Sequence, residues 1–248
     1  IQRLNLADKG IHRLGASAIA LGAKQCINLN MLNLCDNPVL EESDPSLIRS
    51  PKARCIMEQV QAEPAYGHGI VAMLCVALQD HQNMEHINLA ATGLTDTQGP
   101  LLALLVRVSS LQGLYLGRNN LGDETCGHLY LVLSGDKCRL TALTIQCNSF
   151  SALGFYAFWK GILRTNSRLR NLQVGLQSYN VYGSERGQRD IDISLRLNKA
   201  GRLRLLDNRS ALTREWVDCL SGVNDDVDCS FALLRENPTL CGLVSGKL

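Results

Sequence analysis

The side chains that could carry out acid–base chemistry or bind a metal ion do not occur in the patterns that such sites need. No H-E-x-x-H sequence is present, and none of the five histidines has a second histidine at ligand spacing together with a carboxylate, the arrangement that a zinc hydrolase requires. Asp225, Asp226 and Asp228 lie close together, but carboxylates placed in this way are typical of a helix N-terminus, where they interact favourably with the helix dipole. We therefore predict no metal site and no cofactor.

Nucleophilic and phosphate-binding motifs are missing as well. The stretch from Gly117 to Asn120 lacks the glycine-rich loop and the lysine of a P-loop, and no G-x-S-x-G motif occurs. Arg118 in this stretch is the one side chain for which a catalytic role stays open, because an arginine on a turn can stabilise transition-state charge in GTP hydrolysis. Apart from that alternative, the sequence indicates that the protein is not an enzyme.

The ten cysteines fit a structural role better than a chemical one. None forms a C-x-x-C pair, and most lie in apolar periodic runs, whereas a zinc site wants close thiolate pairs and a secreted disulfide scaffold is usually shorter. We interpret them as buried, reduced side chains that pack as small hydrophobes. This predicts an intracellular reducing compartment, with the cytoplasm favoured and an organelle interior as the alternative.

Composition argues against two classes of partner. The 248 residues carry a net charge of +2 and only 5% aromatic residues, so neither a strong positive field nor a base-stacking surface favours nucleic acid. No apolar run reaches the roughly 20 residues that span a bilayer. Because Ile1 already lies inside a repeated pattern, we expect upstream residues in the natural protein. Nothing in the sequence indicates an oligomeric state.

The elements that must position any functional side chain are set by that pattern, L-x-x-L-x-L-x-x-N-x-L. At its second apolar position the pattern recurs after 28, 27, 29 and 29 residues, with one longer step of 55 residues. A period near 28 with this pattern is the signature of leucine-rich repeats. The long step holds either a degenerate repeat or an insertion of about one repeat's length. The second apolar positions are Leu4, Leu32, Ile87, Leu114, Leu143 and Leu172.

Each slot of the pattern has a physical reason. The L-x-L alternation has a period of two and builds a short strand with one buried face. The asparagine amide can satisfy backbone groups where the chain turns away from the strand, which would otherwise be buried and unpaired. A run with helical spacing then returns the chain, as in Leu101, Leu102 and Leu105. Since one unit cannot bury its apolar side alone, the units must stack.

Repeats of this length with full helices resemble the ribonuclease-inhibitor-like class of leucine-rich repeats, over residues 1–183. The resemblance implies an α/β solenoid with parallel strands on the concave face and helices on the convex face. It leaves the task open, because the class includes inhibitors, GTPase-activating proteins, immune receptors and scaffolds. Lys9, Thr92 and Gln177 replace the asparagine, and we expect looser or differently bonded turns there.

An irregular segment, residues 38–64, interrupts the array. It contains four prolines and an acidic run, which indicates a surface excursion from the stack. A short helix is predicted from Pro51, with Ser50 as its N-cap. A docking or regulatory loop is the alternative interpretation, because long loops in compact folds are often functional.

Residues 184–248 fit the terminal cap that the last open layer of a solenoid needs. Apolar residues alternate from Ile191 to Leu197 before a turn-prone stretch, so this region starts with either a hairpin or a helix. Two helices are predicted after it, with Thr213 and Asn224 as N-caps. The strings LRLNKAGRLRLL and ALLRENPTLC also look similar to tails of repeat proteins from diatoms and related algae, a resemblance that carries no known chemistry.

In this fold, the residues that flank the buried strand leucine face the concave surface. They are polar and mostly uncharged, with Tyr115 near the middle. Tyrosine and arginine are favoured anchors of protein interfaces, so Tyr115 and Arg118 are the leading contact candidates. Docking on another surface is the alternative. Further candidates for contact with a partner are His86, Asn88, Asn171 and Gln173.

Taken together, these patterns predict a non-enzymatic protein–protein interaction module or scaffold, in the form of a structural subunit of a larger complex. One alternative is a GTPase-activating protein of the same repeat class. Another is a sensor or inhibitor domain of a longer protein.

Overall fold

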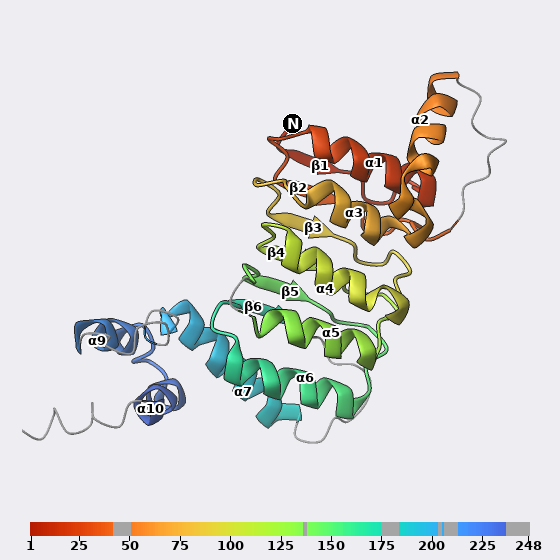
Figure 1. Cartoon of the computed structure of the whole chain (residues 1–248). Coiled ribbons are helices and arrows are strands. Elements are labelled where there is room, and N and C mark those ends of the chain that lie inside the picture. Colours follow the sequence, from red (N-terminus) through yellow and green to blue (C-terminus); the bar gives the residue numbers. More distant parts are fainter. Residues whose placement is uncertain (42–50, 136–137, 175–183, 203–204, 206–212, 237–248) are drawn as a thin grey trace, which may run out of the picture.

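The chain forms a stack of strand–turn–helix units (Figure 1). The computed structural model describes residues 1–41, 51–135, 138–174, 184–202, 205 and 213–236. Six short strands form one parallel sheet in the order β1-β2-β3-β4-β5-β6, which confirms the predicted leucine-rich repeat solenoid. The strands are β1 (Arg3–Asn5), β2 (Met31–Asn33), β3 (His86–Asn88), β4 (Gly113–Tyr115), β5 (Ala142–Thr144) and β6 (Asn171–Gln173).

The sheet pairs equivalent repeat positions. Leu32 lies opposite Leu4 and Ile87, and Leu114 lies opposite Ile87 and Leu143. The side chains of these central residues are fully buried from Leu32 to Leu143. Because β2 and β3 pair directly, the long step in the sequence is an insertion within one repeat and not a degenerate repeat.

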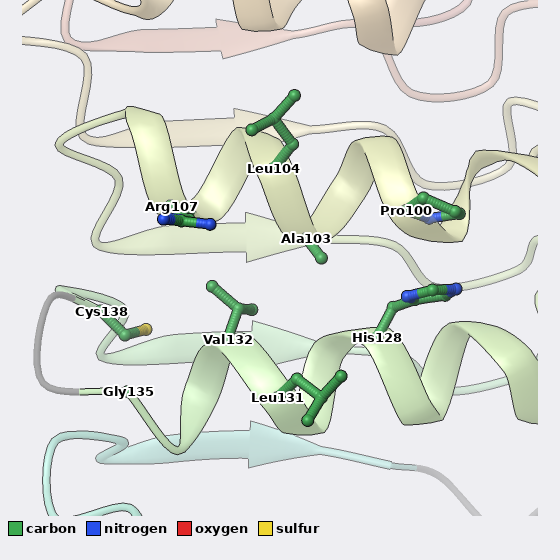
Figure 2. Close-up of a pocket in the computed structure, with 9 residues that line it drawn as sticks. All are labelled: Pro100, Ala103, Leu104, Arg107, His128, Leu131, Val132, Gly135 and Cys138. Carbon is green, nitrogen blue, oxygen red and sulfur yellow. The ribbon is translucent and has the colours of Figure 1, made fainter.

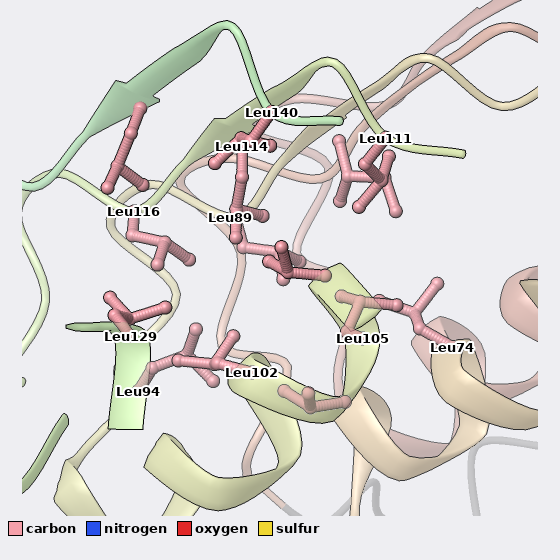
Figure 3. Close-up of a cluster of buried hydrophobic side chains, with 14 of the residues drawn as sticks. Leu74, Leu89, Leu94, Leu102, Leu105, Leu111, Leu114, Leu116, Leu129 and Leu140 are labelled. Carbon is pink, nitrogen blue, oxygen red and sulfur yellow. The ribbon is translucent and has the colours of Figure 1, made fainter. Parts of the chain in front are cut away.

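Five helices cover one face of the sheet and supply the other side of the core. Leu102 and Leu105 of α4 share a buried cluster with Leu89, Leu114 and Leu116 of the strand side (Figure 3). The five helices are α1 (Arg13–Gln25), α3 (Ile70–Leu78), α4 (Gly99–Val108), α5 (Asp123–Leu133) and α6 (Ala152–Thr165), with the 3-10 turn η3 (Asp96–Gln98) leading into α4.

The insertion adds a helix outside the regular stack. α3 packs against both α1 and α4, so it occupies the helix position of the repeat that starts with β2. The added elements are α2 (Pro51–Ala62) and the 3-10 helix η2 (Pro64–His68). α2 starts at Pro51 as predicted, while Ser50 and the rest of residues 42–50 lie outside the described residues.

The asparagine of the pattern binds backbone groups of two repeats at once. Asn119 Nδ2 donates to the carbonyl oxygen of Leu116 in its own repeat (3.0 Å) and to that of Leu89 in the preceding repeat (2.8 Å). Its Oδ1 accepts from the N–H groups of Thr92 and Leu94 at 3.0 and 3.1 Å. The predicted role of this side chain is therefore confirmed, and it extends to the neighbouring repeat. The same arrangement recurs at Asn37, and Asn148 makes both carbonyl bonds but accepts from a single N–H, that of Leu121.

One of the three turns without asparagine is differently bonded, as expected. The Thr92 hydroxyl donates to the carbonyl oxygen of Leu89 at 2.6 Å, which replaces the bond within the repeat. A hydroxyl carries a single donor, so threonine does not supply the second donor of the amide. The turn at Lys9 is held by the next repeat: the backbone N–H of Lys9 donates to Asn37 Oδ1 at 3.0 Å. Gln177 lies outside the described residues.

The C-terminal region starts with a helix, α7 (Ser184–Lys199), so the hairpin alternative is wrong for this segment. The alternation in the sequence consists of two pairs at helical i, i+4 spacing. Ile191 and Leu195 pack with the core of the repeats, whereas Ile193 and Leu197 pack in a second, smaller cluster. A helix that is buried on two sides therefore shows the same alternation of apolar and polar residues as a half-buried strand.

α9 (Thr213–Ser221) and α10 (Val227–Glu236) follow and pack with α7 (Figure 1). The predicted cap Asn224 is wrong, because Asp226 Oδ1 accepts from the N–H groups of Asp228 and Cys229 at 3.0 and 3.1 Å. α9 starts at Thr213 itself, and its cap position 212 lies outside the described residues. α7 packs against α6 and β6, the last helix and the last strand of the repeats. This packing supports our proposal that residues 184–248 cap the stack.

Candidate functional site

The candidate contact residues lie on the sheet face opposite the helices. In each strand the central side chain points into the core, so the two flanking residues point the other way. The strand register aligns these flanking positions into two columns. One column contains Asn5, Asn33, Asn88, Tyr115, Thr144 and Gln173. The other contains Arg3, Met31, His86, Gly113, Ala142 and Asn171.

His86 and Tyr115 form the centre of this face. The Tyr115 hydroxyl lies 3.4 Å from His86 Nδ1, and the two ring centroids are 6.2 Å apart. Gly113 makes this pairing fit, because a Cβ at Gly113 would lie 2.2 Å from His86 Nδ1. Both rings are partly exposed, so they can contact a partner while they hold each other in place.

Asn88 lies beside Tyr115 in the neighbouring strand. Its Oδ1 accepts from the N–H of Ala90 at 3.0 Å, which uses the acceptor to hold the turn that follows β3. Asn33 makes the same bond to Cys35 and also donates to Asn5 Oδ1 at 2.9 Å. The column of asparagines is therefore partly structural, a role that the sequence analysis did not assign to it.

Arg118 lies at the edge of this face, on the turn that follows β4. Its backbone has a positive φ of 58°, and its guanidinium lies 3.5 Å from the carboxylate of Asp36. Asp36 belongs to the turn two strands away, and Ala91 occupies the equivalent position in the turn between them. The short side chain of Ala91 leaves room for the ion pair to span the intervening repeat. Both partners are largely exposed, at 69% and 45%, so the pair itself contributes little stability.

The structure brings together only part of the predicted set. His86, Asn88 and Tyr115 lie on the adjacent strands β3 and β4, with Arg118 just beyond the end of β4. Asn171 and Gln173 are exposed on β6, and β5 separates them from β4. They extend the face to its far end but are not part of the central cluster.

The cysteines are free thiols in the part of the chain that the structure describes. Burial raises the pKa of the Cys75 and Cys126 thiols to about 12, and Cys138, Cys219 and Cys229 are buried as well. The predicted role as small buried hydrophobes is confirmed for these five. It is wrong for the exposed cysteines, which are Cys26, Cys55 and Cys147.

Two features are absent from the part of the chain that the structure describes. No group of three or more His, Cys, Asp or Glu side chains within those ranges is placed to hold a metal ion. Likewise, no helix among the described residues combines the length and the apolar character that crossing a bilayer needs.

Two curated relatives share sequence with this chain, while no known family model matches it. The protein phosphatase 1 regulatory subunit 37 homolog of Caenorhabditis briggsae is 27% identical over 186 residues, which cover 70% of this chain and 19% of that protein. The homolog of Caenorhabditis elegans is 29% identical over 133 residues, which cover 51% and 14%. The chain thus spans less than a fifth of the length of these relatives.

Two solved structures are also similar. The leiomodin-1 actin-binding site 2 structure gives a TM-score of 0.45 at 17% identity and covers 58% of this chain and 81% of that one. The tropomodulin C-terminal domain of Caenorhabditis elegans gives a TM-score of 0.48 at 17% identity and covers 79% and 99%.

Proposed function

We propose that this chain is a non-enzymatic protein–protein interaction module and that it binds its partner through the concave sheet face. The observation that carries the proposal is the continuous parallel sheet, whose free face centres on the His86–Tyr115 pair and ends at Arg118. Tyrosine and arginine are among the side chains that most often anchor interfaces. Six strands also span roughly 24 Å, since neighbouring strands lie about 4.8 Å apart.

The curated relatives support a regulatory role, since both are named as homologs of protein phosphatase 1 regulatory subunit 37. We extend the proposal to a ribonuclease-inhibitor-like repeat module that serves a regulatory or scaffolding subunit, with a phosphatase 1 catalytic subunit as the first partner to test. An intracellular location belongs to the same proposal, and the free thiols of the described residues support it.

Titration calorimetry of the chain with the phosphatase 1 catalytic subunit tests both parts of this proposal. We expect a complex that Tyr115→Ala weakens about thirtyfold, because a central interface tyrosine contributes about 2 kcal/mol. Tyr156→Ala is the matched control, since Tyr156 is a partly exposed aromatic residue on the helix side and its loss should leave binding unchanged. Absence of binding would rule out this partner, and equal effects of the two variants would rule out the concave face.

A GTPase-activating role for Arg118 is the alternative from the sequence. The nearest charged partner of its guanidinium is Asp36 at the sheet edge, and this orients the arginine along the face that we assign to docking. A single-turnover GTPase measurement with the native chain and Arg118→Ala distinguishes the two roles. Our proposal expects that neither the native chain nor Arg118→Ala changes the rate at which the GTPase hydrolyses GTP.

A further inference from the structure

A second surface with binding potential lies on the helix side, between α4 and α5. A groove of about 450 Å³ runs between these helices, lined mainly by Pro100, Ala103, Leu104, Leu131 and Val132 (Figure 2). Leu104 and Leu131 are 42% and 70% exposed, although large apolar side chains on a helix usually face the core. Exposed leucines that line a groove are a feature of interaction surfaces.

One end of this groove meets a polar hollow. Arg107 lines both, and in Figure 2 it lies near Cys138 at the end of the groove away from Pro100. The hollow measures about 960 Å³ and lies at the edge of the sheet where the strands begin. Arg139 and Arg168 line it too, and each stands three residues before a strand, β5 or β6. The repeat therefore stacks arginines at equivalent positions of neighbouring units.

The charge of the hollow is unbalanced. Among the described residues that line it, three are arginines and only Asp80 is a carboxylate. None of the three guanidiniums forms an ion pair with a residue that the structure describes. Arginine side chains in this setting present donors that match carboxylates in a bidentate geometry.

The neighbouring polar groups are already used within the protein. His81 Nδ1 accepts from the N–H of Met84 at 3.1 Å, and its Nε2 faces the carbonyl oxygen of Cys26 at 3.1 Å. The Ser110 hydroxyl lies 3.2 and 2.9 Å from the carbonyl oxygens of His81 and Met84. The three arginines are therefore the positively charged groups that the hollow offers to an external ligand.

We propose that the groove and the hollow together form a docking site for an acidic segment of a partner protein. Apolar side chains of that segment lie between α4 and α5 against Leu104 and Leu131. Its carboxylates pair with Arg107, Arg139 and Arg168. Charge complementarity selects the acidic segment, and the apolar groove that continues from the arginines distinguishes it from a purely anionic ligand. The groove lies on the helix side of the repeats and the hollow at the sheet edge, so this site does not depend on the function proposed for the concave face.

Fluorescence anisotropy with a labelled synthetic peptide tests the proposal. The peptide carries leucines in its first half and glutamates in its second half, and two analogues replace the glutamates by glutamine or the leucines by serine. We expect the parent peptide to bind, with an affinity that falls as salt rises, and both analogues to bind at least about tenfold more weakly. Equal binding of the glutamine analogue, or no binding of the parent peptide, would overturn the proposal.

Protein variants locate the bound peptide. The double variant Arg139→Ala/Arg168→Ala should weaken binding about tenfold or more, and Leu131→Ser should weaken it as well. Arg170→Ala is the matched control, because Arg170 is exposed near the same edge but does not line the hollow. Tyr115→Ala should have no effect, which separates this site from the concave face. If inorganic polyphosphate bound as tightly as the peptide, with no effect of Leu131→Ser, the site would be a plain anion site and the proposal would be wrong.

Discussion

At the scale of single residues, the repeat depends on one amide that is used completely. Asn119 is only 5% exposed, and its donors and its acceptor bind backbone groups of two repeats. A buried backbone group that loses such a partner still carries the free-energy cost of its desolvation, with no hydrogen bond to offset it. The asparagine therefore stabilises the stack chiefly by preventing unpaired backbone groups between neighbouring units.

We expect Asn119→Ala to lower the free energy of unfolding by about 3 kcal/mol, because it leaves several buried N–H and C=O groups unpaired. Asn120→Ala is the adjacent control, since Asn120 is exposed, and its effect should stay within about 0.5 kcal/mol. Urea denaturation followed by circular dichroism measures both values. Equal stability of the two variants would show that the bonds of Asn119 are dispensable.

At the scale of elements, an acidic residue in one repeat caps the helix of the next. Asp96 Oδ1, in the turn before α4, accepts from the N–H of Gly122 (2.6 Å) and from the N–H and hydroxyl of Thr125 (3.1 and 2.6 Å) at the start of α5. Asp123 acts in the same way on Ser151 before α6. Gly122 gives the carboxylate access, because a Cβ there would lie 2.4 Å from Asp96 Oδ2.

Replacing this cap should have an effect that depends on pH. Burial alone would raise the pKa of Asp96, but the hydrogen bonds from Thr125 and Gly122 outweigh it and lower the pKa below its ordinary value. The stabilisation is therefore complete above the unfolded-state pKa near 4 and is lost as pH falls through the lower folded-state value. We expect Asp96→Ala to cost about 2 kcal/mol at neutral pH.

Asp96→Asn separates charge from hydrogen bonding, since asparagine keeps an acceptor oxygen but does not titrate. Chemical denaturation of the native chain and this variant between neutral pH and about pH 3 measures the difference in stability. That difference should be constant at higher pH and shrink in the acid range. A difference that grows as the solution becomes acidic would contradict the proposed role of the carboxylate.

The sequence could predict the strand columns, because a fixed period and an alternating pattern determine both the register and the outward positions. This reasoning places Tyr115, His86 and Asn88 on the outward face of the sheet. Two contacts could not be predicted from the pattern: the fit of the His86 ring over Gly113 and the ion pair of Arg118 with Asp36 across the turn at Ala91. Each depends on a small residue in a neighbouring repeat. The arginine hollow could not be predicted either, because its residues come from different kinds of element. Arg107 lies at a helix end, and Arg139 and Arg168 lie in loops.

The C-terminal helix shows a second limit at this scale. Apolar residues at every second position fit a half-buried strand as well as a helix that is buried on two sides. What decides in favour of the helix is the presence of two separate clusters, one on each side of α7. That information lies in the packing of distant segments and not in the local pattern.

At the scale of the whole molecule, the described residues contain two hydrophobic units. One core runs through the repeats from Leu14 in α1 to Ile191 in α7. A smaller cluster, which includes Trp216, joins α7 to α9 and α10. Ion pairs of Arg196 with Asp225 and Asp226 add to this second unit, but exposed pairs contribute little. The smaller unit should therefore depend mainly on its few buried apolar side chains and on the buried Arg202, which pairs with Glu236 at 3.6 Å.

This division predicts different outcomes for two core substitutions. Leu143→Ala removes a fully buried side chain from the sheet and should destabilise the repeats by about 3 kcal/mol. Trp216→Ala should cost the C-terminal unit a similar amount and leave the repeats folded.

Hydrogen exchange measured by mass spectrometry distinguishes the two, because Trp216→Ala should accelerate exchange in α9 and α10 while strands β2 to β5 keep their protection. Val217→Ala is the neighbouring control, since Val217 is 50% exposed. If Trp216→Ala accelerated exchange in the strands to the same degree, the two units would be one cooperative fold, and the covering of β6 by α7 would be a requirement for the whole stack.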